Sequence, residues 1–303
     1  MLHFGVHSGP QDCTIGELRE LWTVTENLGF EWISIWDHFY ASQVDPRKDC
    51  FEAVSCHTAL ALTTSRVRVG SLVYCATYRH PADLANAAAT IDHFSSGRLE
   101  FGIGAGWHEL EHNGYGYPFD PPARRLRRLA EAVEVIRLLW TEDDVHYEGE
   151  FFTLTDAICN PKPLQRAPRI WIGASGEHLA LPLVGRLADG WNIAYVSPDA
   201  LGRKLDIVRQ HAPDPGRLVV GVNVGLVLTD GDPEEDLRRR FGDAVDVVKQ
   251  GTLYGSVDQI VEKVGRYEAA GAQWLNIGVR APFELEALER FMLEVVPQCG
   301  AGQ

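Results

Sequence analysis

The side chains best suited to chemistry in this sequence are histidines and aromatic residues that directly follow short apolar runs. They comprise His7, Asp37-His38, Tyr74-Cys75, the segment 104–108, Ala174-Ser175-Gly176, Asn192, Tyr195, Asn223 and Arg280. Imidazole groups titrate near neutral pH and can exchange protons with a substrate. Carboxylates are scarce in this set, which points away from chemistry that depends on several of them.

Metal hydrolysis and glycoside hydrolysis both need residues that the sequence does not provide at these positions. A metal-dependent amidohydrolase barrel needs a His-x-His pair on its first strand and carboxylate ligands further along. His3 and His7 are four residues apart, and the later strand ends carry no matching Asp or Glu. A glycosidase needs a second carboxylate at a strand end, which is also missing. We therefore expect no metal site.

A glycine-rich segment, residues 102–106, follows a predicted strand and has the pattern Gly-x-Gly-x-Gly. It formally resembles a dinucleotide-binding loop, but no acidic residue ends the next strand, so the evidence for such a loop is weak. Glycines at these positions would let the backbone and a flat ring approach closely, because a Cβ would clash there. A tight turn without a ligand is an equally valid interpretation of this segment.

A second small-residue segment, residues 172–178, combines the end of a strand, a turn and the start of a helix. Ser175 is placed to cap that helix. Free backbone N–H groups and the positive end of a helix dipole make such a turn suitable for an anion, and late loops of barrels often hold phosphate. Phosphate binding and an ordinary serine cap are therefore both open for this turn.

The elements that carry these residues alternate between strand and helix along the chain. Eight runs fit strands, at residues 2–7, 31–36, 67–74, 99–103, 169–172, 191–194, 218–228 and 274–279. The intervening helical patterns cover residues 15–28, 51–62, 81–94, 123–140, 177–188, 200–211, 233–248, 257–270 and 284–295. The strands are almost continuously apolar, which is typical of a parallel sheet covered by helices.

Eight such units predict an α/β fold of the (β/α)8 TIM-barrel type, with chemistry at the carboxyl ends of the strands. An open doubly wound sheet is the alternative, weakened because no glycine fingerprint follows the first strand. An insertion at about residues 141–167 contains a predicted hairpin, 145–153, that turns at Glu148-Gly149. No linker marks a second domain, so we expect residues 1–303 to form one.

Composition limits the partners. The 28 basic and 42 acidic residues give a formal charge of 28 − 42 = −14, which disfavours nucleic acid and anionic membranes. No apolar run reaches the ~18 residues of a membrane span, and the N-terminus lacks a signal-peptide pattern. The six cysteines show no metal or disulfide spacing. We expect a cytoplasmic protein that acts on a small molecule.

Several motifs resemble one family over about residues 2–295. They are Trp36-Asp37-His38, the segment 69–81, His93-Phe94-Ser95-Ser96-Gly97-Arg98, and the segments 102–107, 171–176 and 187–192. Together they resemble the bacterial luciferase-like superfamily, and most closely its oxidoreductases that use the deazaflavin coenzyme F-420. Monooxygenases that use flavin mononucleotide share the same barrel and many of the same glycines, so this cofactor remains the alternative.

The resemblance implies where the cofactor would bind. The deazaflavin ring would rest on a bulge with a non-prolyl cis peptide bond, here Leu72–Val73. Asp37 and Cys75 match positions that hydrogen-bond the ring, although a thiol is a poor donor. Ala174, Ser175 and Gly176 match a phosphate-binding turn. The remaining expected cofactor contacts are Gly104, Ala105, Gly106 and His108.

The resemblance also implies a catalytic role for His38, which would take the proton of a hydroxyl group while a hydride passes to C5 of the deazaflavin. His108 and His7 are the next candidates for this role. The expected substrate pocket consists of His7, Trp36, Tyr78, Trp107 and Arg280, with Arg280 either an anchor for a substrate oxygen or a salt-bridge partner at the rim. Ser197 and its neighbours replace a lysine that sugar-phosphate dehydrogenases of this branch use, so glucose 6-phosphate is not the expected substrate.

Three functions follow as alternatives: an F-420-dependent oxidoreductase, a flavin mononucleotide-dependent monooxygenase, and a non-catalytic cofactor-binding protein. The resemblance favours the first, and His38 and the aromatic mouth count against the third. Proteins of this family commonly pair through helices, and the predicted helices 51–62 and 81–94 carry small residues that permit close contact. We expect a homodimer formed through Ala59, Ala61, Ala85, Ala87, Ala88 and Ala89.

Overall fold

The computed structural model describes residues 2–242 and 245–299, apart from the side chains of residues 240 and 241. Eight parallel strands pair in a ring in which β9 closes onto β10. They are β1 (His3–Ser8), β2 (Trp32–Ile35), β3 (Arg68–Ser71), β5 (Leu99–Gly104), β8 (Ile170–Gly173), β9 (Gly190–Ala194), β10 (Val219–Leu228) and β12 (Trp274–Val279). The predicted TIM barrel is therefore confirmed.

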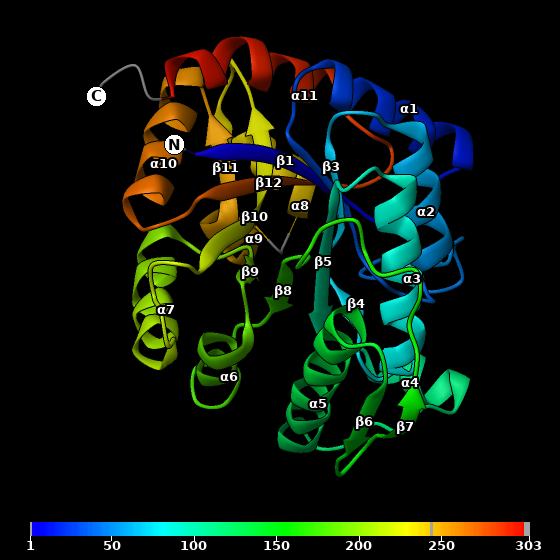
Figure 1. Ribbon diagram of the computed structural model, residues 1–303. Helices are drawn as coiled ribbons and strands as arrows, with labels where there is room; N and C mark the ends of the chain where they lie inside the picture. The colour runs from blue at the N-terminus through cyan, green and yellow to red at the C-terminus, as the bar shows by residue number, and fades with distance from the viewer. Residues whose placement is uncertain (1, 243–244, 300–303) are drawn as a thin grey trace.

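Helices surround this barrel (Figure 1). They are α1 (Ile15–Asn27), α2 (Ala53–Thr63), α3 (Pro81–Phe94), α5 (Pro122–Thr141), α6 (Ala180–Leu187), α7 (Pro198–His211), α8 (Pro233–Phe241), α10 (Val257–Ala269) and α11 (Leu285–Arg290). A π turn, Phe291–Val295, and a 3-10 turn, Val296–Gln298, extend α11. None of the helices within residues 2–242 and 245–299 is both long and apolar enough to cross a membrane.

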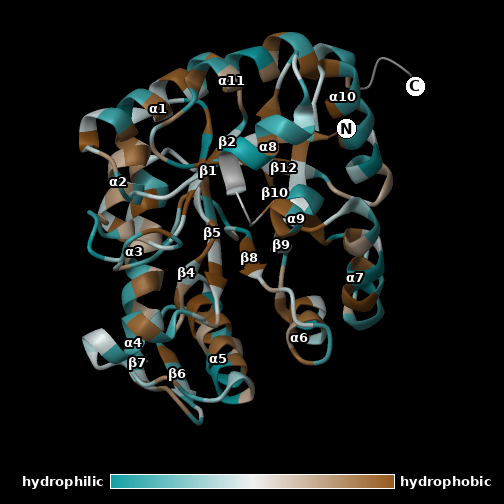
Figure 2. Cartoon of the chain, turned by 180° about the vertical axis from the view of Figure 1, so that it is seen from behind, coloured by the Kyte–Doolittle hydropathy of each residue, from teal (hydrophilic) through white to brown (hydrophobic). Residues whose placement is uncertain are grey.

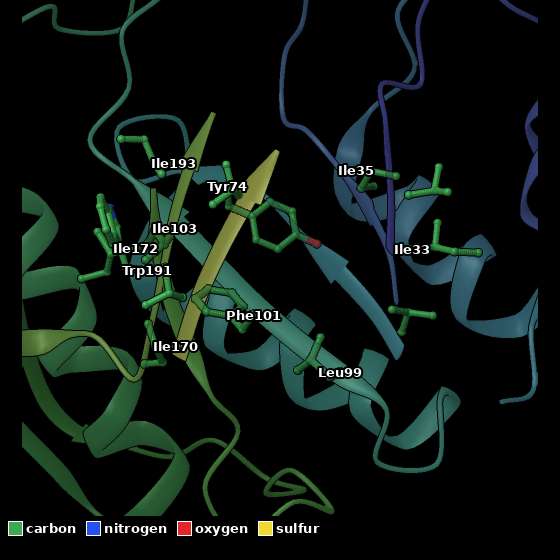
Figure 3. Packing of buried hydrophobic residues seen from close by; sticks show 14 of the residues in the cluster. Ile33, Ile35, Tyr74, Leu99, Phe101, Ile103, Ile170, Ile172, Trp191 and Ile193 are labelled. Carbon is green, nitrogen blue, oxygen red and sulfur yellow. The ribbon is translucent and has the colours of Figure 1, made fainter. Parts of the chain in front are cut away.

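The strands separate two cores because alternate side chains point to opposite faces. One set points outward and packs under the helices: Leu99, Phe101 and Ile103 of β5 form part of it (Figure 3), and the Phe101 ring lies 5.3 Å from that of Trp140 in α5. The other set fills the barrel interior with Trp32, Trp171 and Trp274. Figure 2 shows central strands such as β5 and β8 in hydrophobic colours, with hydrophilic colours on outer helices such as α10.

The third predicted strand is not continuous. β3 ends at Ser71, the Leu72–Val73 bond is cis as the resemblance implies, and the short β4 (Tyr74–Cys75) then pairs with β5. The bulge needs space that glycines provide. A Cβ on Gly104 would lie 2.7 Å from Val73 Cγ2, and one on Gly173 would lie 3.0 Å from both Val73 methyl groups. These glycines therefore make room for Val73.

Two predicted helices differ from the structure. The predicted helix 177–188 begins only at Ala180, and its N-cap is Leu179 without a side-chain cap bond, so Ser175 is not a helix cap. The predicted helix 233–248 is split at Gly242, where φ is +51°, into α8 and α9 (Val245–Val248). Residues 243–244 of this prediction lie outside the described residues.

Three short elements were not predicted: α4 (Glu109–Tyr115), the strand β11 (Thr252–Gly255) beside β10, and a 3-10 turn, Lys249–Gly251. The predicted hairpin exists, but it consists of β6 (Val145–Glu148) and β7 (Thr153–Ala157), so its turn spans residues 149–152 and is longer than expected. The carboxylate of Glu131 in α5 accepts the backbone N–H groups of Glu150 and Phe151 at 2.8 and 2.9 Å. These bonds hold the open turn against α5.

The helix residues proposed for dimer contact require a correction. Ala61, Ala85, Ala88 and Ala89 are buried inside the chain itself, because α2 and α3 pack on the strands and on each other. A second copy of the chain cannot reach these four, whereas Ala59 is exposed and Ala87 is half-buried, so these two stay predicted contacts. The large apolar side chains that α2 and α3 expose are Leu62 and Phe94, which are 62% and 48% exposed.

Candidate active site

A cavity of about 660 Å³ opens at the carboxyl ends of the strands. Its walls are the bulge after β3, the loop between β5 and α4, the turn between β8 and α6, and the first residues of α5. The sequence-predicted site residues among its lining are Trp36, Asp37, His38, Leu72, Val73, Cys75, Tyr78, Gly104, Ala105, Gly106, Trp107, Ala174, Ser175 and Gly176. His7, His108 and Arg280 are not part of this lining.

His38 is held by a carboxylate that the sequence did not reveal. His38 Nδ1 lies 2.9 Å from Glu111 Oε2, and the Glu111 side chain is fully buried. An ionised carboxylate only accepts hydrogen bonds, so Nδ1 carries the proton and donates it. His38 Nε2 makes no hydrogen bond to the described residues and is left as an acceptor. This tautomer suits a general base.

Several donors surround Glu111 and keep it ionised. Its Oε1 accepts the backbone N–H groups of Phe39 and Tyr40 at 2.7 and 2.8 Å, and the Tyr78 hydroxyl donates to Oε2 at 2.5 Å. Burial raises the pKa of Glu111, but the hydrogen bond from His38 and these further donors outweigh it and lower the pKa to about 2. Glu111 is therefore charged at neutral pH and fixes the loop that carries His38.

Asp37, which also lines the cavity, stabilises the bulge. It accepts two hydrogen bonds from Arg79, at 2.6 and 3.1 Å, and one from the backbone N–H of Cys75 at 2.9 Å. Arg79 also pairs with Glu52 at 2.5 Å. Burial opposes the charge of Arg79, but Asp37 and Glu52 raise its pKa. The chain thus already occupies most of the acceptor capacity of Asp37.

The Cys75 thiol is buried and unreactive as a nucleophile. Burial raises its pKa to about 12, so it stays protonated at neutral pH. Its Sγ lies 3.0 Å from Thr77 Oγ1, which lies 2.7 Å from His112 Nε2. Gly106 borders this group with φ +76°, and a Cβ there would lie 2.6 Å from the sulfur. The loop after β5 therefore requires a glycine at this position.

The turn between β8 and α6 offers backbone donors. The N–H groups of Ser175 and Gly176 make no hydrogen bond within the described part of the chain. Lys204 donates to the Ser175 carbonyl at 2.9 Å and to Glu177 at 2.7 Å, which fixes the turn and balances the Glu177 charge. Backbone N–H groups before a helix can bind an anionic oxygen. The turn can do so although Ser175 does not cap α6.

His7 and Arg280 form a separate group under Trp36. Burial and the nearby Arg280 lower the pKa of His7 to about 3, and its Nδ1 lies 3.0 Å from Ser34 Oγ. Arg280 donates to the Ser42 carbonyl and to Gln43 Oε1, both at 2.9 Å, and its guanidinium lies 4.9 Å from the Trp36 ring centre. Arg280 therefore fastens the loop after β2 and forms no salt bridge in the described structure.

His108 begins α4 and faces Glu111. Its Nδ1 accepts the Glu111 backbone N–H at 3.4 Å, so it caps the helix, and its ring centre lies 5.4 Å from that of His38. Burial lowers the pKa of His108, although Glu111 opposes this shift. Trp107 is 59% exposed, and its ring centre is also 5.4 Å from that of His38. An aromatic side chain thus covers His38 at the mouth.

Sequence reasoning missed three charged residues of this site: Arg79, Glu111 and Arg125. Arg79 lies within the segment 69–81, but nothing in the sequence of that segment indicates which carboxylate it pairs with. Glu111 lies on α4, a short helix without a clear hydrophobic period. Arg125 lines the cavity from α5, amid a run of arginines that looks like a solvated helix face. No group of three or more His, Cys, Asp or Glu side chains suited to a metal ion occurs among the described residues.

Comparisons with known proteins identify relatives of this chain. A family model described as luciferase-like monooxygenase matches residues 1–243. An uncharacterised protein of Mycobacterium tuberculosis is 37% identical over 133 residues, which span 44% of this chain and 46%, about half, of that protein. An F-420-dependent glucose-6-phosphate dehydrogenase of Segniliparus rotundus is 27% identical over 93% of each chain.

A flavin-dependent relative is about as similar. An FMNH(2)-dependent dimethylsulfone monooxygenase of Pseudomonas putida is 29% identical over 71% of this chain and 59% of that protein. Among solved structures, an F-420-dependent secondary alcohol dehydrogenase in complex with an F-420–acetone adduct superposes with a TM-score of 0.83. It covers 98% of this chain and 99% of the other at 19% identity, so this likeness shows the shared fold.

Proposed function

The chain belongs to the luciferase-like monooxygenase family, and from this premise we propose that it is an oxidoreductase that uses coenzyme F-420. The proposed reaction transfers a hydride between C5 of the deazaflavin and a small organic substrate, an alcohol and its ketone or an activated double bond. Relatives named as F-420-dependent dehydrogenases support the cofactor. The observation that carries the proposal is the His38–Glu111 pair beside the cavity.

The geometry of His38 suits the proton transfer that accompanies hydride transfer. In alcohol oxidation, the substrate carbon loses a hydride, its hydroxyl loses a proton, and the C–O bond becomes C=O. His38 Nε2 is the unpaired acceptor at the cavity and would take the hydroxyl proton, while Glu111 stabilises the resulting imidazolium at 2.9 Å. In the reverse direction, the imidazolium would return that proton to a carbonyl oxygen.

The cavity fits a flat cofactor with an anionic tail. Its volume of about 660 Å³ falls within the range of ~300–1,000 Å³ that is usual for small-molecule sites. The bulge at Leu72–Val73 would support the ring, with Asp37, Cys75, Gly104, Ala105 and Gly106 around it. Ala174, Ser175 and Gly176 would hold phosphate, and His108, which caps α4, would affect the cofactor only by fixing the loop between β5 and α4. Bound deazaflavin supplies a two-electron acceptor that reacts poorly with oxygen.

The proposed substrate is small and largely apolar. Trp36, Tyr78 and Trp107 line the cavity, and no lysine occurs among its described lining residues. Ser197 caps α7 by accepting the Ala200 N–H at 3.2 Å. Without the lysine expected there, a sugar phosphate would lack its charge partner. Secondary alcohols and their ketones are therefore the first probes, with His7 and Arg280 supporting the pocket from below Trp36.

The alternative is a monooxygenase that uses reduced flavin mononucleotide, which the dimethylsulfone monooxygenase relative supports. Fluorescence titration of the protein with each cofactor, followed by oxygen-uptake measurements, separates the two. The proposal predicts tight binding of the deazaflavin and substrate-dependent change of its absorbance without oxygen uptake. Micromolar binding of flavin mononucleotide together with no response to the deazaflavin would reject it. Binding of a cofactor without any turnover would leave a non-catalytic cofactor-binding protein.

Two further properties belong to this proposal. We infer a cytoplasmic location, which fits a coenzyme made and reduced inside cells. We also infer a homodimer, for which α2 and α3 offer the exposed apolar residues Leu62 and Phe94. These side chains are large enough to anchor a contact between copies.

A further inference from the structure

A second cavity, of about 930 Å³, lies at the opposite end of the barrel from the candidate active site. Its lining includes the first residues of β1, β3, β10 and β12, which are His3, Arg68, Val219 and Trp274. None of the described residues that line one of the two cavities also lines the other. A ligand at this amino-terminal end would therefore occupy a site separate from the candidate active site.

The charged residues of this cavity are mostly arginines. The arginines are Arg68, Arg137, Arg169, Arg186 and Arg217, and the acidic residues are Glu100, Asp189 and Asp214. This local excess of positive charge contrasts with the formal charge of −14 of the whole chain. The low-dielectric walls of a charged cleft focus its field and raise the local concentration of counter-ions. The cavity should therefore attract anions.

Three of these arginines have partners within the chain. Glu100 is only 1% exposed and accepts hydrogen bonds from Arg68 and, at 3.2 Å, from Arg169. Arg137 lies 2.9 Å from Asp189. A buried carboxylate such as Glu100 needs partners of this kind, because an unpaired buried charge is strongly destabilising. These three arginines therefore have a structural role at the base of the barrel.

Arg186 and Arg217 have no such partners. Arg186 lies in the last turn of α6, Arg217 precedes β10, and both side chains are exposed. Neither guanidinium makes a hydrogen bond or an ion pair to any described residue. A guanidinium presents a planar fork of N–H donors that fits phosphate and carboxylate groups. Two such forks are thus free to bind a ligand in the cavity.

The lining between these two arginines in the sequence is partly apolar. It contains Leu187, Ala188, Ala212 and Pro213. The cavity volume lies near the upper end of the range of ~300–1,000 Å³ that is usual for small-molecule sites. Its size and its apolar residues favour an organic molecule over a small inorganic ion.

We propose that this cavity binds an organic anion with at least two negative charges, held by Arg186 and Arg217. Phosphate esters and polycarboxylates share this chemistry, and the experiment below separates them. The site goes beyond the proposed function and does not depend on it, since it shares no described residue with the candidate active site.

The test titrates the protein with adenosine diphosphate, pyrophosphate and citrate by isothermal calorimetry. The first two probes present phosphate groups and citrate presents carboxylates. Arg186→Gln/Arg217→Gln should weaken binding about 10- to 100-fold, because charge-assisted hydrogen bonds to the anion are lost. The matched control Arg47→Gln/Arg203→Gln removes the same charge from exposed arginines outside the cavity and should bind as the wild type does.

Asp214 provides a readout of opposite sign. It lines the cavity, and its carboxylate accepts the backbone N–H of Gly216 at 3.2 Å. The side-chain oxygen of Asn can accept the same N–H, so Asp214→Asn removes only the negative charge. Affinity for the anion should rise by up to about 5-fold, the size of one exposed charge–charge interaction. Unchanged or weaker binding in this variant would contradict the proposal.

Other outcomes would also overturn it. Displacement of the probe by flavin mononucleotide or the deazaflavin would place the anion in the candidate active site. Equal weakening in the control variant would show a general effect of net charge, and binding of none of the three probes would leave no anion site. Pyrophosphate that binds as tightly as adenosine diphosphate, with citrate unbound, would contradict the organic nature of the ligand.

Thermal unfolding without ligand separates binding from stability. Arg186 and Arg217 make no contacts that a glutamine would break, so the midpoint of Arg186→Gln/Arg217→Gln should equal that of the wild type. A large drop would show that the two arginines stabilise the fold instead. Failure of the protein to bind either flavin mononucleotide or the deazaflavin would overturn the proposed function alone and would not affect the anion titrations.

Discussion

Replacing Glu111 by Gln should change the tautomer of His38 without changing the shape of the site. Glu111 Oε1 accepts two backbone N–H groups, from Phe39 and Tyr40, so the amide oxygen of Gln must occupy that place. The amide NH2 then faces His38 Nδ1, where the carboxylate oxygen stood 2.9 Å away. An NH2 group donates, so Nδ1 becomes the acceptor and Nε2 carries the proton. The base at the cavity is lost.

The size of the effect follows from the bond that is removed. A hydrogen bond to a charged group contributes about 1.5–3 kcal/mol, which is about 10- to 150-fold in rate if it strengthens as the imidazolium forms. Reversal of the tautomer adds to this loss. We expect the alcohol-oxidation kcat to fall by about 10² to 10³, below the ~10⁴ limit for loss of a proton-transfer group.

The assay is stopped-flow absorbance of the deazaflavin with a secondary alcohol, together with cofactor titration and thermal unfolding of each variant. Glu109→Gln is the matched control, because Glu109 is exposed in the first turn of the same helix. Cofactor affinity and KM should stay close to wild type in both variants, and only Glu111→Gln should lose kcat. Wild-type kcat in Glu111→Gln would refute the role of this carboxylate, and a matching loss of cofactor binding would show a structural role instead.

Three further predictions concern the bulge, the buried histidines and assembly. Gly104→Ala should weaken cofactor binding, because its Cβ would lie 2.7 Å from Val73 Cγ2. Adding the substitution Val73→Ala should restore part of the lost affinity. Isothermal titration calorimetry that finds no recovery in the double variant would contradict this packing. Burial lowers the pKa of His57 to about 4, so the unfolded chain binds a proton below pH 6.5 that the folded chain does not, and stability falls as the pH decreases. The His57 shift should lower the free energy of unfolding by about 2 kcal/mol between pH 7 and pH 5. In urea unfolding, the free energy of unfolding of His57→Asn should therefore depend less steeply on pH than that of the wild type. An equal pH dependence in both proteins would refute this prediction. Light scattering of the wild type at micromolar concentration should give the mass of two chains. Leu62→Glu should shift that mass toward a single chain if α2 forms the contact. A monomeric mass of the wild type would refute the dimer.

The barrel was predictable because each strand is apolar and each following helix has its own period, so local signals agree with the closed sheet. The bulge was predictable only through the resemblance, since residues 67–74 have the pattern of one uninterrupted strand. The bulge depends on Gly104 and Gly173, which are distant in sequence from Val73 and leave space for its side chain.

The charged partners of the site could not be predicted for a related reason. Glu111 reaches His38 across 73 positions of sequence, and Arg79 reaches Asp37 across 42. No local spacing encodes these pairs, because the fold alone brings the loops after different strands together. Arg280 is the opposite case, a residue predicted to act in the site that has a structural role instead. Its position after β12 suggested a substrate anchor, but its guanidinium already donates to Ser42 and Gln43 in the loop after β2.

We propose that His38 exchanges the substrate proton during hydride transfer to a deazaflavin. The most direct measurement is the single-turnover absorbance change of bound coenzyme F-420 on mixing with a secondary alcohol, for the wild type and His38→Asn. We expect a substrate-dependent change in the wild type, a rate lower by a factor of about 10² to 10⁴ in His38→Asn, and similar cofactor affinity in both proteins. A wild-type rate in His38→Asn, or no absorbance change of the bound deazaflavin with any alcohol or ketone, would contradict it.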